Sequence, residues 1–123
     1  MWPLRALKRL SRKQAQGQAW EQVARRHLER HGLTLVEANF TCKGGEIDLI
    51  MRDDATLVFV EVRQRADRHH GGAAASITAT KEARLVIAAQ VYLQRYPAMP
   101  PCRFDVVAID GDQLDWLKNC IGF

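Results

Sequence analysis

Apolar residues between positions 15 and 31 recur at the spacing of an amphipathic helix. One face of that helix gathers Trp20, Val23, Ala24, His27 and Leu28. Gly32 follows at the position where a glycine commonly ends a helix. Glu21 lies at the edge of the apolar face and not opposite to it, so its carboxylate is compatible with reaching the sheet on which the helix packs.

Three strand-like stretches follow the helix. They cover residues 33–39, 46–51 and 56–63. Gly44 and Gly45 separate the first two stretches, and Asp53 and Asp54 make a turn between the second and the third. Because only a few polar residues join the last two stretches, we expect them to form a hairpin.

A loop and a second helix are expected next. Residues 64–77 show no clear periodicity, which is typical of a mobile surface loop. Thr78 or Thr80 can cap a helix that runs to about Tyr96 and stops before Pro97.

Two more strands complete the pattern. One is expected at residues 103–109, and a final short one at 113–118 after the turn at Asp110 and Gly111. Helices that flank a run of strands predict a mixed sheet with a helix on each side.

Carboxylates interrupt two of the apolar strands. Successive side chains of a strand point to opposite faces. In the second strand one face carries Glu46, Asp48 and Ile50, and the other carries Ile47, Leu49 and Met51. In the third strand one face carries Phe59, Glu61 and Arg63, and the other carries Val58, Val60 and Val62. If the two strands pair, Asp48 and Glu61 converge near one end of the hairpin.

Two converging carboxylates suit a hard divalent cation such as Mg²⁺, which takes one or two carboxylates and keeps several waters. A metal held there can polarise a phosphate oxygen and lower the pKa of a bound water. Arg63 lies on the face of Glu61 and could steady a negative phosphate. The competing interpretation is a buried or half-buried ion pair of Arg63 with Asp48 or Glu61, and the residues alone favour it because an acid-x-base pattern is common on strands.

Length and composition restrict the class of protein. The 123 residues suffice for one compact domain. Cys42, Cys102 and Cys120 are too widely spaced for a disulfide framework or a metal clip, so we expect reduced thiols. No apolar run approaches the roughly 20 residues of a membrane span, and no secretory signal is recognisable, so we expect a cytoplasmic protein without a membrane partner.

The net charge of +4 is unevenly distributed. Residues 1–16 contain no acid and hold five basic side chains, Arg5, Lys8, Arg9, Arg12 and Lys13. We therefore divide the chain into a basic N-terminal arm, residues 1–14, and one domain, residues 15–123. Such an arm can bind phosphates through counterion release, or it can be a frayed, solvated terminus, and the sequence favours neither.

Several of these motifs occur together in a specific order: Gly17-x-x-x-Glu21, the GGEIDLI segment from Gly44 to Ile50, the VFVEVRQR segment from Val58 to Arg65, Lys81, and Arg103-Phe104-Asp105. The set resembles the YraN family over about residues 15–110. That family comprises small bacterial proteins related to archaeal Holliday-junction resolvases, within the PD-(D/E)XK nuclease superfamily. The resemblance implies an α/β fold of the restriction endonuclease-like type, three-layer α/β/α with a central mixed sheet in the order α-β-β-β-α-β(-β).

The resemblance also implies roles by position. Asp48 and Glu61 match the acids that bind the metal, Mg²⁺ or Mn²⁺. Glu21 matches the helix acid that completes the site, and Arg63 stands at the position of the superfamily's lysine. Glu46 belongs to the family signature and supports either the site or the fold.

Arg63 is the departure that matters. Family members mostly have a lysine there, which is thought to position the attacking water or to stabilise the developing charge. Arginine keeps the positive charge and can bind a phosphate with two hydrogen bonds, but it does not give up a proton. We therefore expect a metal-dependent endonuclease for nucleic acid, with branched or structured DNA as substrate. The alternatives are a catalytically weakened nucleic-acid-binding module on the same fold, and a structural protein whose acids are an ion-pair relic.

Nucleic acid, DNA in the first place, is the expected partner. Phosphate contacts are expected from Arg5, Lys8, Arg9, Arg12, Lys13, Arg65 and Lys81. Lys81 fits a plain surface position equally well. A homodimer would suit a two-fold symmetric junction, but no feature of the sequence demands one. The adjacent His69 and His70 are expected in a solvated loop, and Arg103 with Asp105 as a cross-strand pair.

Overall fold

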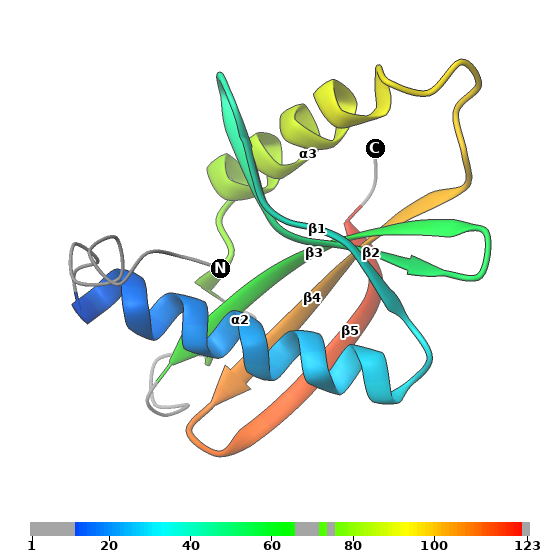
Figure 1. The fold of residues 1–123 in the computed structure, drawn as a ribbon. Coiled ribbons are helices and arrows are strands. Elements are labelled where there is room, and N and C mark those ends of the chain that lie inside the picture. The colour runs from blue at the N-terminus through cyan, green and yellow to red at the C-terminus, as the bar shows by residue number, and fades with distance from the viewer. Residues whose placement is uncertain (1–11, 66–71, 74–75, 122–123) are drawn as a thin grey trace, which may run out of the picture.

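The computed structural model describes residues 12–65, 72–73 and 76–121 (Figure 1). The elements along the chain are α2 (Arg12–Arg30), β1 (Thr34–Cys42), β2 (Gly45–Asp53), β3 (Thr56–Arg65), α3 (Ala79–Leu93), β4 (Cys102–Asp110) and β5 (Gln113–Ile121). The predicted order of helices and strands is confirmed, and the last strand is a full one of nine residues.

The five strands form one mixed sheet in the order β1-β2-β3-β4-β5. Only β3 and β4 are parallel, while the other neighbours are antiparallel. Parallel neighbours need a crossover connection, and α3 lies in the segment that supplies it. Figure 1 shows α2 on one face of the sheet and α3 on the other. The arrangement is the expected α/β fold with a central mixed sheet, and it is consistent with a restriction endonuclease-like architecture.

Each face of the sheet carries its own apolar core. The core beneath α2 includes Ala24, Leu28, Leu49, Met51, Val58, Val60 and Val107. The core beneath α3 includes Ile50, Phe59, Leu85, Ala88, Ala89, Tyr92 and Phe104. Burying one large apolar side chain stabilises the fold by about 1.5–3 kcal/mol, so the two cores fix both helices on the sheet. Val23 is an exception to the predicted apolar face of α2, because 42% of it is exposed.

The first residues of β2 run directly beneath α3. A Cβ atom on Gly45 would overlap the carbonyl group of Arg84, so only glycine fits there. Gly44 precedes it with a φ of 95°, a left-handed conformation that glycine adopts without strain. The two glycines thus let the β1–β2 hairpin pass under the helix, and they hold Arg84 beside β2.

The sheet forks where β2 leaves β3. The ladder between these strands ends at the pair Leu49↔Val60. Beyond that pair β3 stays paired with β4, whereas β2 stays paired with β1. Asp48 and Glu61 are the first residues past the last pair, one on each side of the fork.

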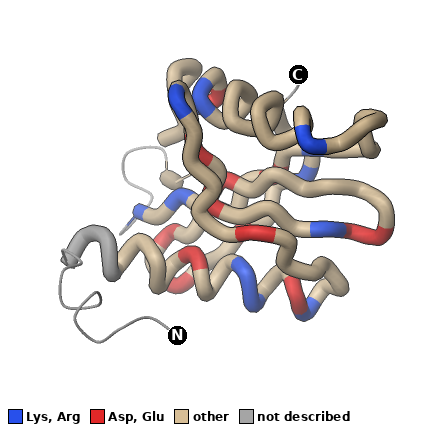
Figure 2. Tube along the Cα trace, turned by 45° about the horizontal axis from the view of Figure 1, so that its top comes forward, with Lys and Arg blue, Asp and Glu red and all other residues tan. Residues whose placement is uncertain are grey.

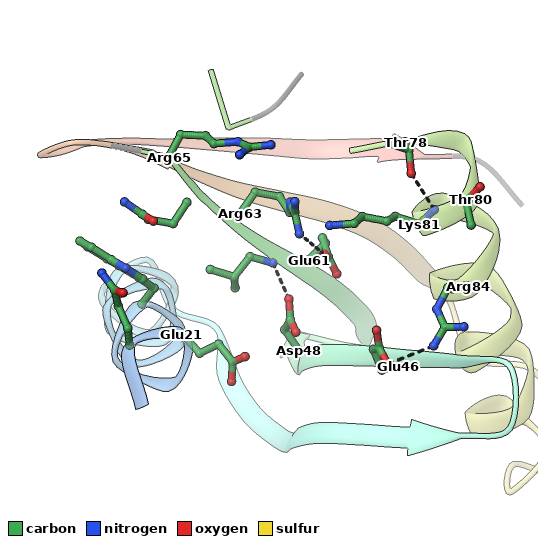
Figure 3. A pocket seen from close by; sticks show the side chains of 15 residues that line it. Glu21, Glu46, Asp48, Glu61, Arg63, Arg65, Thr78, Thr80, Lys81 and Arg84 are labelled. Carbon is green, nitrogen blue, oxygen red and sulfur yellow. Dashed lines mark hydrogen bonds and ion pairs between the residues drawn. The ribbon is translucent and has the colours of Figure 1, made fainter. Parts of the chain in front are cut away.

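The fork also changes the faces of β2. Strict alternation predicts Ile47 on the face of Leu49 and Met51, but Ile47 packs with Ile50 in the core beneath α3. That prediction was wrong because the alternation holds only while the strand stays regular. Asp48 lies at the break and points into the fork (Figure 3).

The segment after β3 differs from the expected surface loop. The strand continues to Arg65, and Gly72 and Ala73 are buried. The N–H group of Ala73 donates a hydrogen bond of 2.7 Å to the buried carboxylate of Asp110. Residues 66–71 and 74–75 lie outside the described residues. The loop prediction was therefore wrong at its start and at the two buried residues.

The helix bounds differ by a few residues. Helix α2 begins at Arg12, inside the segment predicted to be the arm, and α3 ends at Leu93 instead of near Tyr96. Thr78 is the N-cap of α3, since its side chain accepts a hydrogen bond from the N–H group of Lys81. Neither of these helices combines the length and the apolar character that crossing a membrane requires.

Candidate active site

Asp48 occupies the gap that opens between β2 and β3. Its Oδ2 accepts a hydrogen bond of 2.8 Å from the N–H group of Val62. Since β2 no longer pairs with β3 at this level, the side chain of Asp48 takes the place of a β2 carbonyl as the partner of that amide. The fork thus anchors one carboxylate oxygen of Asp48 in the wall of the pocket.

Two further carboxylates contact Asp48. The side chain of Glu61, on β3, lies within hydrogen-bonding reach of Asp48, and so does the side chain of Glu21, on α2. The predicted contact between Asp48 and Glu61 is therefore present, and three acids from three elements meet at the fork (Figure 3). Figure 2 shows acidic positions in red on α2 as well as on strands of the sheet.

Burial disfavours the charged forms of these acids, and the charge of Asp48 adds to this effect for Glu21 and Glu61. Burial, followed by the charge of Asp48, raises the pKa of Glu61 to about 8. The same two causes raise the pKa of Glu21 to about 7. Burial also raises the pKa of Asp48, against the hydrogen bond from Val62 and the charge of Arg63. The site therefore holds protons near neutral pH that a divalent cation would displace.

The donor set at the fork fits a hard cation held by few protein ligands. Its oxygens come from carboxylates, the ligands that Mg²⁺ and Mn²⁺ prefer. Within residues 12–65, 72–73 and 76–121, no three acidic, histidine or cysteine side chains surround one point as a full set of metal ligands. Asp48 and Glu61 together would thus supply two carboxylates and leave the remaining positions to water or substrate, as is usual for Mg²⁺.

Arg63 lies beside the acids in a defined position. Its Nε donates a hydrogen bond of 3.0 Å to Oγ of Ser76, and its terminal nitrogen is 3.7 Å from Oε1 of Glu61. The ion pair considered as the alternative to a metal site is therefore present for Glu61. The charges of Arg63 and Lys81 lower the pKa of Glu61, but they do not offset its burial and the charge of Asp48.

An open pocket of about 750 Å³ contains the fork. Its lining combines the acids Glu21, Glu46, Asp48 and Glu61 with the bases Arg63, Arg65, Lys81 and Arg84. Lys81 points from the first turn of α3 towards Glu61 and Arg63 (Figure 3). Burial, followed by the charge of Arg63, lowers the pKa of this lysine. Cations thus face the acids across a space that is open to a large ligand.

The basic residues predicted to bind nucleic acid are only partly described. Arg65 and Lys81 line the pocket. Arg5, Lys8 and Arg9 lie outside the described residues, and for Arg12 and Lys13 the structure describes only the helical backbone. Phosphate contacts by the arm therefore stay a prediction.

Sequence reasoning missed Asn39 and Arg84. The side chain of Asn39, on β1, hydrogen-bonds Glu21, and its φ is 56°. Arg84 donates a hydrogen bond of 3.2 Å to Glu46 at the rim of the pocket. Nothing local marks Asn39, whereas the spacing of three residues from Lys81 would have placed Arg84 on the same side of α3.

Arg103 and Asp105 have a structural role outside the pocket. They pair along β4, with Nε of Arg103 3.1 Å from Oδ1 of Asp105, and not across strands as predicted. The cross-strand links run from the fully buried Asp105 to β5, through Nε1 of Trp116 and the N–H group of Asn119, both at 2.9 Å. This carboxylate therefore ties the last strand to the sheet.

Comparison with known proteins identifies relatives over most of the chain. The model of the family described as "Uncharacterised protein family UPF0102" matches residues 20–109. A UPF0102 protein of Herminiimonas arsenicoxydans is 60% identical over 109 residues, which cover 89% of this chain and 88% of that protein. Those of Dechloromonas aromatica and Cupriavidus taiwanensis are 59% and 57% identical, over 85% and 87% of this chain and over 87% and 82% of their own lengths. The resemblance to the YraN family is thereby confirmed.

Proposed function

This chain belongs to the UPF0102 family, and we propose that it is a metal-dependent nuclease that cleaves nucleic acid, with branched or structured DNA as the first candidate substrate. The observation that carries the proposal is the contact among Glu21, Asp48 and Glu61 in an open pocket rimmed by cations. A purely structural ion pair balances its charges, whereas this site gathers like charges at a cost to the fold. Such arrangements are typical of functional sites.

The acids of the fork would bind the cation. Asp48 and Glu61 would hold Mg²⁺ or Mn²⁺, whose chemistry when bound is to polarise a phosphoryl oxygen and to lower the pKa of a coordinated water. The hydrogen bond from Val62 fixes the orientation of Asp48. Glu21 lies against Asp48 from the other layer and would complete the negative site.

The bases of the pocket would bind the phosphodiester. Arg63 is held by Ser76 through Nε, which leaves its terminal nitrogens for Glu61 and for a phosphate oxygen. Lys81 reaches towards the same place from α3, and its lowered pKa brings it closer to proton transfer than an ordinary lysine. We therefore assign to Lys81 the compact ammonium group that an arginine at position 63 does not provide.

A second candidate function is binding without cleavage. The observation that favours it is the position of Arg63, because its guanidinium is already paired with Glu61 and bonded to Ser76. An arginine fixed in this way would hold a phosphate but would not supply a proton or yield space to an attacking water. The chain would then be a nucleic-acid-binding module that keeps the fold of a nuclease.

A cleavage assay separates the two functions. Labelled duplex, flap and four-way-junction DNA would be incubated with the protein and Mg²⁺ or Mn²⁺, beside Asp48→Ala and beside Glu29→Gln, an exposed acid of α2 that is ion-paired with Arg25. We expect the wild type and Glu29→Gln to cleave at least one substrate, and Asp48→Ala to lose about 100-fold or more, which corresponds to about 2.7 kcal/mol of barrier. Binding without cleavage would favour the second function, and neither binding nor cleavage would contradict both.

A further inference from the structure

Two histidines and a tryptophan form a separate cluster at the C-terminal end of α2, which the proposed nuclease site does not use. His27 lies in the last turn of the helix, His31 follows its end, and Trp116 comes from β5. The two imidazole rings have their centres 4.6 Å apart, and both rings meet the indole edge-on, at 6.1 and 5.5 Å. We propose that His27 and His31 form a binding site for a late first-row transition-metal ion, Ni²⁺, Cu²⁺ or Zn²⁺, independent of the acidic fork.

The spacing of the two rings matches that of ligands on one ion. Residues four apart on a helix lie one above the other on the same face. An imidazole nitrogen binds such a metal at about 2.0–2.1 Å, so two rings on one ion at an angle between square and tetrahedral have centres roughly 4.5–5.2 Å apart. The observed 4.6 Å is in this range. The interplanar angle of 36° shows that the rings are not stacked flat on each other.

His31 is fixed in the tautomer that a metal ligand needs. Its Nδ1 lies 2.8 Å from the backbone carbonyl oxygen of His27. A carbonyl can only accept a hydrogen bond, so Nδ1 carries the proton and, in the neutral ring, the lone pair is on Nε2. A backbone carbonyl that orients the ring through its second nitrogen is a recurrent arrangement around histidine ligands. His31 is exposed to solvent, so an ion has access to it.

His27 is also suited to be a ligand. In the part of the chain that the structure describes, neither of its ring nitrogens has a hydrogen-bond partner. The half-buried position restricts the ring, which reduces the entropy lost on binding.

The chemistry of the two sites differs enough to separate their ligands. Imidazole suits Ni²⁺, Cu²⁺ and Zn²⁺, whereas carboxylates and water suit Mg²⁺. Two histidines make an incomplete shell, so water fills the remaining positions and the affinity stays moderate. Arg30 opposes a cation, whereas the C-terminal end of α2, with its negative dipole, favours one.

Calorimetric titration of the full chain with NiCl₂, in the presence of excess MgCl₂ to occupy the fork, tests the site. We expect one Ni²⁺ per chain, and a loss of affinity of at least about tenfold in His27→Gln and in His31→Gln. The double variant His69→Gln/His70→Gln is the matched control for an ordinary histidine pair and should bind as the wild type does. Ni²⁺ should also quench the fluorescence of Trp116, and that part of the quenching should vanish in Trp116→Phe.

If His27→Gln unfolds, the variant His31→Gln still tests the proposal. His31 is exposed, so its replacement leaves the core intact. Unchanged Ni²⁺ affinity in His31→Gln would overturn the proposal, as would the absence of Ni²⁺ binding by the wild type. A chain that binds no Ni²⁺ here would not contradict the nuclease proposal, because that proposal is tested separately by Asp48→Ala at the fork.

Discussion

Glu61 combines burial with a negatively charged neighbour, Asp48, and these causes raise its pKa to about 8. A carboxyl group whose pKa is higher in the folded than in the unfolded chain stabilises the fold while it is protonated. That contribution is complete below the ordinary pKa of about 4.5 and is lost as the pH rises through about 8. At alkaline pH and without a bound cation, the charged acids of the fork therefore lower the stability of the folded chain.

Because a charged Glu61 destabilises the folded chain, Glu61→Gln should have a pH-dependent effect on stability. Glutamine resembles the neutral acid and stays uncharged at every pH. We expect denaturant unfolding without divalent cations to give the variant and the wild type the same free energy of unfolding near pH 4.5. Near pH 9 the free energy of unfolding of the variant should be higher by about 1–3 kcal/mol. Glu29→Gln, on the exposed face of α2, should show no such difference between the two pH values. Equal stability of Glu61→Gln and the wild type at both pH values would show that the fork is not strained by its charges.

Lys81 and Arg63 are two cations that lie beside the acids of the fork, and we assign to Lys81 the ammonium group that Arg63 lacks. If Lys81 acts beside the reacting phosphate, Lys81→Met should lower kcat by about 100-fold. The double variant Lys81→Met/Arg63→Lys should recover about tenfold of that loss, because the lysine at position 63 then supplies the ammonium group. Arg84→Met is the control, since Arg84 lies on the same helix but is already paired with Glu46. If Lys81→Met cleaves at the wild-type rate and Arg63→Lys alone cleaves faster than the wild type, the role belongs to position 63 and not to Lys81.

At the scale of elements, the sequence was sufficient to predict the strands but not the fork. The apolar pattern of β2 and β3 indicates that both are buried, and the acids interrupting it indicate a site. The pattern does not show where the ladder between the strands ends, because pairing depends on partners far away in the chain. The face of Ile47 was therefore predicted wrongly, and the link from Asn39 to Glu21 could not be foreseen.

The close approach of α3 to β2 makes Gly45 indispensable. Gly45→Ala forces the helix backbone away from the strand, and we expect a loss of about 1–3 kcal/mol in the free energy of unfolding. Because α3 carries Lys81, the variant should also bind DNA less tightly. Gly17→Ala is the matched control, since a Cβ there meets no atom within 4 Å and alanine favours a helix by up to about 1 kcal/mol. A Gly45→Ala protein as stable as the wild type would contradict the packing described.

At the scale of the whole molecule, two groups of basic side chains could bind phosphates: those that line the pocket and the five of the N-terminal arm, which has no acid. Deleting residues 1–11 removes Arg5, Lys8 and Arg9 and keeps every residue that the structure describes. If these three bind phosphates, the slope of log affinity for DNA against log salt should become shallower by about 2–3, at about 0.9 for each phosphate that is no longer neutralised. Measurement of DNA binding at several salt concentrations gives this slope. An unchanged slope would show that the arm does not bind the nucleic acid.

Asp48 and Glu61, with Glu21 beside them, are proposed above to hold a divalent cation at the fork. Calorimetric titration with Mn²⁺ at about pH 7.5, in two buffers of different ionisation enthalpy, measures both the binding and the protons released. Since the pKa values of Glu21 and Glu61 are raised to about 7 and about 8, a cation at the fork must displace protons. We predict one Mn²⁺ bound with release of roughly one proton, and the loss of both in Asp48→Asn. A wild-type protein that binds no Mn²⁺, or that binds it as Asp48→Asn does and without proton release, would contradict the claim.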